Sequence, residues 1–153
     1  MSDSPAEAVD TNDEVTRAEN VKHLELIQAI ITRLASNSFL VKGWSLTVSM
    51  AAYGVSLNRT DWRLAIIGLA LTLGFWWLDS YFLRQERLFR LLYDYVRSDI
   101  RAVPRFAMNV SIFLDRDIVQ QGKVMGSGTL VAFYGVLAIV GMAIVTISIL
   151  VHV

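Results

Sequence analysis

The chain has 153 residues, of which 54% are hydrophobic and 18% charged, and its formal net charge is zero. The apolar residues gather in three long runs, which is typical of a membrane protein and leaves too few residues for a separate globular domain with a large core. Because the chain has no cysteine, disulfides, thiolate catalysis and cysteine-ligated zinc or iron–sulfur sites are excluded.

Two segments precede the first apolar run. Residues 1–14 are acidic and lack large apolar side chains, so we expect a disordered tail. Residues 15–37 repeat apolar side chains at spacings of three and four, which predicts an amphipathic cytosolic helix whose apolar face needs a partner. Asn37 and Ser38 mark a candidate break, although nothing there prevents the helix from continuing into the membrane.

A transmembrane hairpin is predicted over residues 38–83, with spans at 39–57 and 64–83. Each span is close to the roughly 20 residues needed to cross the hydrocarbon. The polar turn 58–63 is short, so the two spans must be antiparallel. No Gly or Pro interrupts the passage from the second span into the charged stretch that follows, so we expect the helix to continue to about Val103, before Pro104.

Residues 84–126 form a basic segment that we expect to be cytosolic or interfacial and helical. Within it, 105–126 alternates apolar residues like a strand, but a lone strand has no partner for its backbone, so we favour a short amphipathic helix near the membrane. Residues 127–153 are the third transmembrane helix, uncharged over 129–151, with Ser127 or Thr129 as its cap. The predicted fold is therefore an all-α integral membrane protein with three transmembrane helices, an N-terminal cytosolic amphipathic helix and a long cytosolic extension of the second span.

Charge predicts the orientation. Eight cations lie between the second and third spans, whereas the hairpin turn carries Arg59 and Arg63. Because positive residues in short flanking segments stay on the cytoplasmic side, we expect the N-terminus to be cytoplasmic and the C-terminus outside.

Lys42 and Asp79 are the charged residues at corresponding positions of the two hairpin spans. Counted from Thr60 at the tip, Lys42 lies 18 residues back and Asp79 lies 19 residues forward, so both sit at the same depth. Two interpretations stay open: an interhelical ion pair, or two side chains that snorkel separately to the headgroups. A proton- or ion-relay role would require a further ionisable group.

Aromatic and small residues predict anchoring and packing. The tryptophans occur in paired depths toward the two ends of the spans, which favours interfacial anchors over a ligand cage; they are Trp44, Trp62, Trp76 and Trp77. Small residues on each span favour close helix packing and, because three spans make a poor monomeric channel, a homo-oligomer; they are Ser45, Ser49, Ala52, Ala65, Gly68, Thr72, Gly135, Ala138 and Gly141.

The basic exit helix carries Arg84, Arg87, Arg90, Arg97 and Arg101. These side chains predict either a solvated face paired with neighbouring acids or contacts to anionic lipid or a cytosolic protein partner. A nucleic-acid partner is not expected, since no Gly-rich loop or stacking platform is present.

We expect His23 on the surface. We find no metal-spaced set, cofactor motif or catalytic triad in the sequence, so a non-enzymatic protein is predicted.

Two strings carry a family resemblance: KHLELIQAIITRLASNSFLVKGWSLT (Lys22–Thr47) and DSYFLRQERLFRLLYDYVR (Asp79–Arg97). They resemble a family of small, mostly uncharacterised bacterial inner-membrane proteins with this order of elements. The resemblance implies an inner-membrane location and no catalytic role. In its layout the chain is also similar to small membrane effectors of bacterial defence systems, which implies oligomerisation and membrane permeabilisation.

Together these observations predict a homo-oligomeric inner-membrane protein with pore-forming or membrane-perturbing effector activity. The alternatives are a membrane-anchored adaptor or scaffold that docks a cytosolic partner, and an accessory subunit of a transporter.

Overall fold

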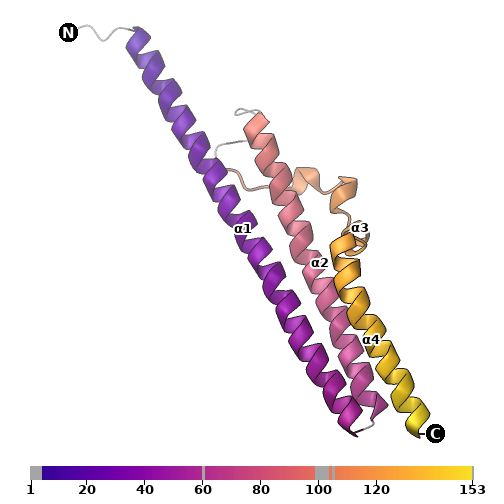
Figure 1. Cartoon of the computed structure of the whole chain (residues 1–153). Coiled ribbons are helices and arrows are strands. Elements are labelled where there is room, and N and C mark those ends of the chain that lie inside the picture. Colours follow the sequence, from indigo (N-terminus) through magenta and orange to yellow (C-terminus); the bar gives the residue numbers. More distant parts are fainter. Residues whose placement is uncertain (1–4, 60, 99–103, 105, 153) are drawn as a thin grey trace.

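The computed structural model describes residues 5–59, 61–98, 104 and 106–152, with side chains from 14 to 151. This part of the chain is helical and has no strand. Its elements are α1 (Pro5–Arg59), α2 (Trp62–Ser98), the short 3₁₀ helices η1 (Ser111–Phe113) and η2 (Asp117–Val119), α3 (Gln121–Met125) and α4 (Gly128–His152) (Figure 1). The helices α1, α2 and α4 are long and apolar enough to cross a membrane, which confirms the prediction of a helical chain with three helices of this kind.

Helix α1 is continuous over 55 residues, which corrects the expectation of a disordered tail and decides between the two alternatives left open at Asn37 and Ser38. Residues from Pro5 onward form its first turns instead of a disordered tail, because Pro suits a first turn and the Ala and Glu that follow are strong helix formers. The helix also passes through Asn37 and Ser38 without a break. Ser38 is buried against α2, so it belongs to a helix interface and does not end the helix.

The hairpin turn is tighter than the predicted polar loop, since α1 ends at Arg59 and α2 begins at Trp62. Asp61 caps α2: its carboxylate accepts the Arg63 N–H at 2.9 Å, and its carbonyl accepts the Ser56 hydroxyl at 2.8 Å. At the other end, α2 is described to Ser98, so its expected continuation over residues 99–103 lies outside the described residues.

Seven-residue spacing organises the contacts among α1, α2 and α4, with α2 between the other two (Figure 1). Buried positions recur every seven residues, as in the seam of a left-handed helical bundle. On α2 these positions are Ala65, Thr72, Asp79 and Glu86, and on α4 they are Leu130, Leu137 and Ile144 with Tyr134, Gly141 and Ser148. Ser38, Ser45, Ser49 and Ser56 line the matching face of α1.

Tyr53 connects all three long helices near the middle of this seam. Its hydroxyl lies 3.0 Å from Thr72 Oγ1, which is itself 2.8 Å from Ser49 Oγ. A Cβ atom built on Gly68 of α2 would lie 2.6 Å from Cε1 of the Tyr53 ring, and one on Gly141 of α4 would lie 2.7 Å from its Cζ. Glycine is therefore required at both positions for the ring to fit between the helices. Of the three small residues predicted on α4, Gly141 alone is buried in this seam.

A second apolar cluster, the distal core, lies at the end of the molecule away from the hairpin turn. It gathers residues of α1, α2 and the connector, which we define as residues 104–126: Ile27, Ile31, Leu88, Leu92, Val96, Phe113 and Val119. The apolar face predicted for residues 15–37 thus finds its partner in α2 and the connector.

The connector is neither a strand nor the single amphipathic helix that we favoured. Its described residues form η1, η2 and the short α3, joined by turns. Local polar contacts compete with a continuous helix: Asn109 Oδ1 accepts the Ser111 N–H at 2.9 Å, and Phe106 has a φ of 60°. Of the two candidate caps of α4, Ser127 does not act through its side chain, because its buried Oγ has no hydrogen-bond partner among the described residues.

Candidate functional site

A buried ion pair joins α1 to α2. Lys42 Nζ lies 2.7 Å from Asp79 Oδ2, the Asp79 side chain is fully buried, and that of Lys42 is 28% exposed. The predicted interhelical pair is confirmed, and separate snorkelling does not describe Asp79. A carboxylate removed from solvent needs compensation, and Lys42 supplies the opposite charge.

Two hydroxyl groups complete the surroundings of Asp79. Ser38 of α1 donates to Oδ1, and Tyr134 of α4 donates to Oδ2 at 3.1 Å. Lys42 Nζ also donates to Ser38 Oγ at 2.9 Å. One carboxylate therefore fixes all three long helices in register. Tyr134 was not predicted as part of the pair, although it is among the few hydrogen-bonding side chains in residues 129–151.

Trp76 is an internal contact and not a free anchor. Its Nε1 donates to the Met125 carbonyl at 3.1 Å, and its ring stacks on Tyr134 with centroids 6.0 Å apart. The other three tryptophans predicted as anchors are exposed, as interfacial anchoring requires: Trp44, Trp62 and Trp77. Their anchoring role stays a prediction.

Two of the arginines predicted to contact lipid or a partner hold the connector. Arg84 Nε donates to the Val119 carbonyl at 2.7 Å, and Arg87 donates to the Ile118 carbonyl at 2.9 Å. With Trp76 they form one face of α2 that runs along the connector. Such side-chain donors satisfy carbonyls that an interrupted helix leaves without backbone partners.

The remaining arginines differ from one another. Arg90 donates to Glu86 at 2.6 Å, which is the self-paired face that the sequence predicted. Arg97 is exposed at the end of α2, and Arg101 lies outside the described residues. Contacts of Arg90, Arg97 and Arg101 with lipid or a partner stay predictions.

His23 is buried, which corrects the expectation of a surface histidine. Its side chain is 4% exposed, its Nε2 lies 3.1 Å from the Ala107 carbonyl, and the Phe106 ring packs 5.8 Å from its own. The connector covers this part of α1, and sequence spacing gave no sign of that long-range crossing. Within the described residues no three His, Cys, Asp or Glu side chains are grouped to hold a metal ion.

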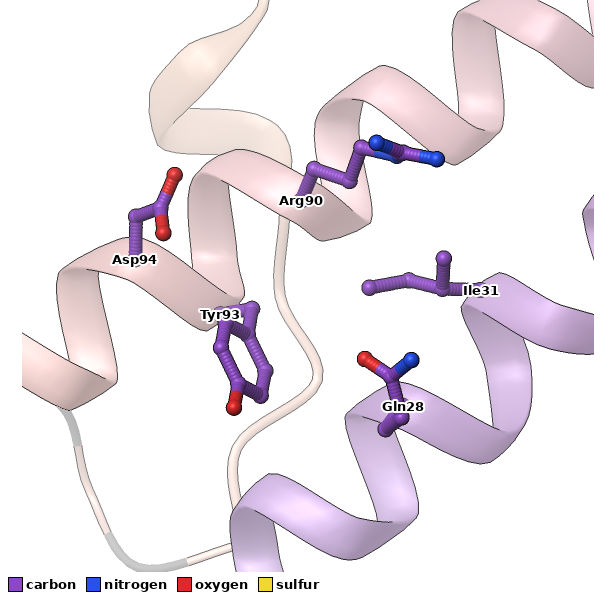
Figure 2. Close-up of a pocket in the computed structure, with 5 residues that line it drawn as sticks. All are labelled: Gln28, Ile31, Arg90, Tyr93 and Asp94. Atoms are coloured by element: carbon purple, nitrogen blue, oxygen red, sulfur yellow. The ribbon is translucent and has the colours of Figure 1, made fainter.

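A small polar depression of about 270 Å³ opens between α1 and α2 beside the distal core (Figure 2). Gln28 and Ile31 of α1 face Arg90 and Tyr93 of α2 across it, and Asp94 stands at its edge. These are hydrogen-bonding groups around one apolar side chain.

A wider depression of about 480 Å³ lies between the end of α2 and the connector. Arg97 from α2 and Arg116 from the connector line it, together with the Tyr95 and Phe113 rings, which meet edge to face at 5.8 Å. Asp94 lies between the two depressions and lines both. The described part of the chain thus presents two neighbouring polar surfaces around the distal core.

Comparison with protein-family models, curated proteins and solved structures finds no match to this chain.

Proposed function

We propose that this protein is a non-enzymatic membrane scaffold that holds a rigid helical module in the cytoplasm for a protein partner. The single observation that carries the proposal is the continuity of α1. One helix contributes Lys42 and Ser38 to the seam with α2 and α4, and Ile27 and Ile31 to the distal core. A transmembrane anchor and a packed module outside it are thereby joined with no hinge in the described helix.

The proposed setting is the bacterial inner membrane, with the distal core in the cytoplasm. The cationic excess between the second and third spans supports this orientation. The packing of the seam supports a scaffold over a monomeric pore, because Tyr53, Leu137 and Ile144 occupy the space among the three helices.

Membrane integrity tests this proposal. The full-length chain is expressed under an inducible promoter while propidium iodide uptake and growth are followed, and the purified chain is added to dye-loaded vesicles. We expect neither dye uptake nor vesicle leakage. Leakage that rises with protein concentration contradicts the scaffold and favours the effector.

A homo-oligomeric, membrane-perturbing effector is the second candidate, and one observation favours it. Gly43 and Gly54 lie on an exposed face of α1, and a Cβ atom built on either has no neighbour within 4 Å. In lipid, small residues allow the close backbone approach that holds helices of two copies together.

Substitution on this face separates a dimer contact from a lipid contact. Gly43→Leu with Gly54→Leu is expected to shift a homo-oligomer to monomer in nanodiscs, measured by mass photometry. Gly74→Leu is the matched control, since Gly74 on α2 is equally open. An oligomer that resists the double substitution contradicts assembly through this face.

A further inference from the structure

We infer that the depression around Arg97 and Arg116 is a docking site for an acidic segment of a cytosolic protein, anchored by apolar side chains of that segment. The inference rests on the proposed scaffold function and names the surface and the chemistry of its partner.

The residues that line this depression carry an excess of positive charge. The lining carries two guanidinium groups, Arg97 and Arg116, against the single carboxylate of Asp94. Both arginines are exposed, and neither forms an ion pair with a carboxylate of the described residues. This contrasts with Arg84, Arg87 and Arg90, whose donors are engaged within the chain. Two guanidinium groups from different elements present paired donors to carboxylates, which they bind in bidentate geometry.

Exposed apolar side chains of the connector are the second observation. Ile112 and Leu114 are exposed, with Ile112 59% exposed. Ile112 and Leu114 flank the buried Phe113 that lines the depression. Exposed apolar residues that flank a lining residue of a cationic depression match a partner that carries both acidic and apolar groups.

Distance along α2 favours a protein segment over lipid as the occupant. Asp79 lies roughly 28 Å from the hairpin tip at 1.5 Å per residue, near the limit of a hydrocarbon core about 30 Å thick. Arg97 lies 18 residues further, roughly 27 Å beyond Asp79 along the same helix. Headgroups add only about 5–8 Å on each side, so the depression stands clear of the membrane surface.

Packing and hydrogen bonds hold the connector backbone beside the depression in place. Phe113 and Val119 are buried in the distal core, and the Arg84 and Arg87 side chains hold the carbonyls of residues 118–119. A preformed surface loses little entropy when a partner binds, which favours recognition of a short segment.

Peptide binding to the full-length protein tests the inference. The chain is placed in nanodiscs of neutral phosphatidylcholine, and a fluorescently labelled peptide of alternating glutamate and leucine or phenylalanine is titrated by anisotropy. We expect saturable binding that weakens about tenfold in the R97Q/R116Q variant. R59Q/R63Q is the matched control, since it removes two charges at the hairpin turn and should leave binding within about twofold.

Companion titrations identify the chemistry. Peptides with glutamine for glutamate, or serine for leucine and phenylalanine, should each lose binding, and Ile112→Ser should weaken it. The inference is overturned if R97Q/R116Q binds as the parent does, or if the serine peptide binds equally well. It is also overturned if anionic phosphatidylglycerol nanodiscs abolish peptide binding to the parent protein at about 0.15 M salt, where repulsion between bilayer and peptide is screened within about 8 Å, because lipid then occupies the site.

These outcomes are separable from those of the scaffold proposal. A chain that binds no acidic peptide and leaves membranes intact contradicts this docking site alone, whereas membrane leakage contradicts the scaffold itself.

Discussion

Substitution of Lys42 by Met should cost much more stability than the same change at Lys22. The two lysines have carboxylate partners at similar N–O distances, 2.7 Å to Asp79 and 2.9 Å to Glu25. They differ in burial, since the side chains of Lys22 and Glu25 are 65% and 59% exposed while that of Asp79 is fully buried. Removing one partner of a buried pair leaves an uncompensated charge and costs about 3–5 kcal/mol. Because Lys42 is itself partly exposed, we expect the lower end, about 3 kcal/mol, against about 0.3–0.5 kcal/mol for Lys22→Met.

The free energy of unfolding in bicelles, measured by steric trapping, gives both values. Asp79→Asn completes a double-mutant cycle, because it removes the charge at nearly unchanged size and keeps one oxygen acceptor, for either Ser38 or Tyr134. We expect a coupling energy of about 2 kcal/mol between Lys42→Met and Asp79→Asn. A coupling near zero, or equal losses at Lys42 and Lys22, refutes the argument that burial makes this pair important.

Two further substitutions probe the packing of the bundle by the same measurement. Gly68→Ala should lose about 1–3 kcal/mol, because its Cβ would meet the Tyr53 ring at 2.6 Å, whereas Gly74→Ala, with open space around it, should be neutral or slightly stabilising; equal effects at the two glycines would show that the Tyr53 ring moves aside freely. Trp76→Phe should lose about 1 kcal/mol with its hydrogen bond to α3, and the exposed Trp77 should tolerate the same change within about 0.5 kcal/mol; a larger loss at Trp77 would contradict the internal role of Trp76.

Depth along the hairpin was predictable from the sequence. A short turn forces the spans to be antiparallel, so counting from its tip places Lys42 opposite Asp79, and the structure has them in contact. Counting from the hairpin tip cannot give the depth of residues on α4, because the register of α4 depends on how the connector folds. Tyr134 therefore reaches Asp79 without any signal in the spacing of its own helix.

The secondary structure of the connector could not be predicted from sequence periodicity, for a physical reason. Its buried residues, Phe113, Val119 and Val124, follow neither a period of two nor one of 3.6, because 3₁₀ turns and extended links alternate. A segment of this kind satisfies its carbonyls with side chains from elsewhere. Arg84 and Arg87 donate to the carbonyls of residues 118–119. Their spacing along α2 is that of an exposed face and predicted contacts with lipid or a partner.

Helix α1 has a mechanical consequence, because it has no break along its 55 residues. Contacts of His23, Ile27 and Ile31 with α2 and the connector hold this helix beyond the Lys42–Asp79 pair. Residues 5–22 continue past these contacts as the same helix (Figure 1), and 18 residues at 1.5 Å each extend about 27 Å from the distal core. The direction of this N-terminal end is therefore set by the packing of the distal core.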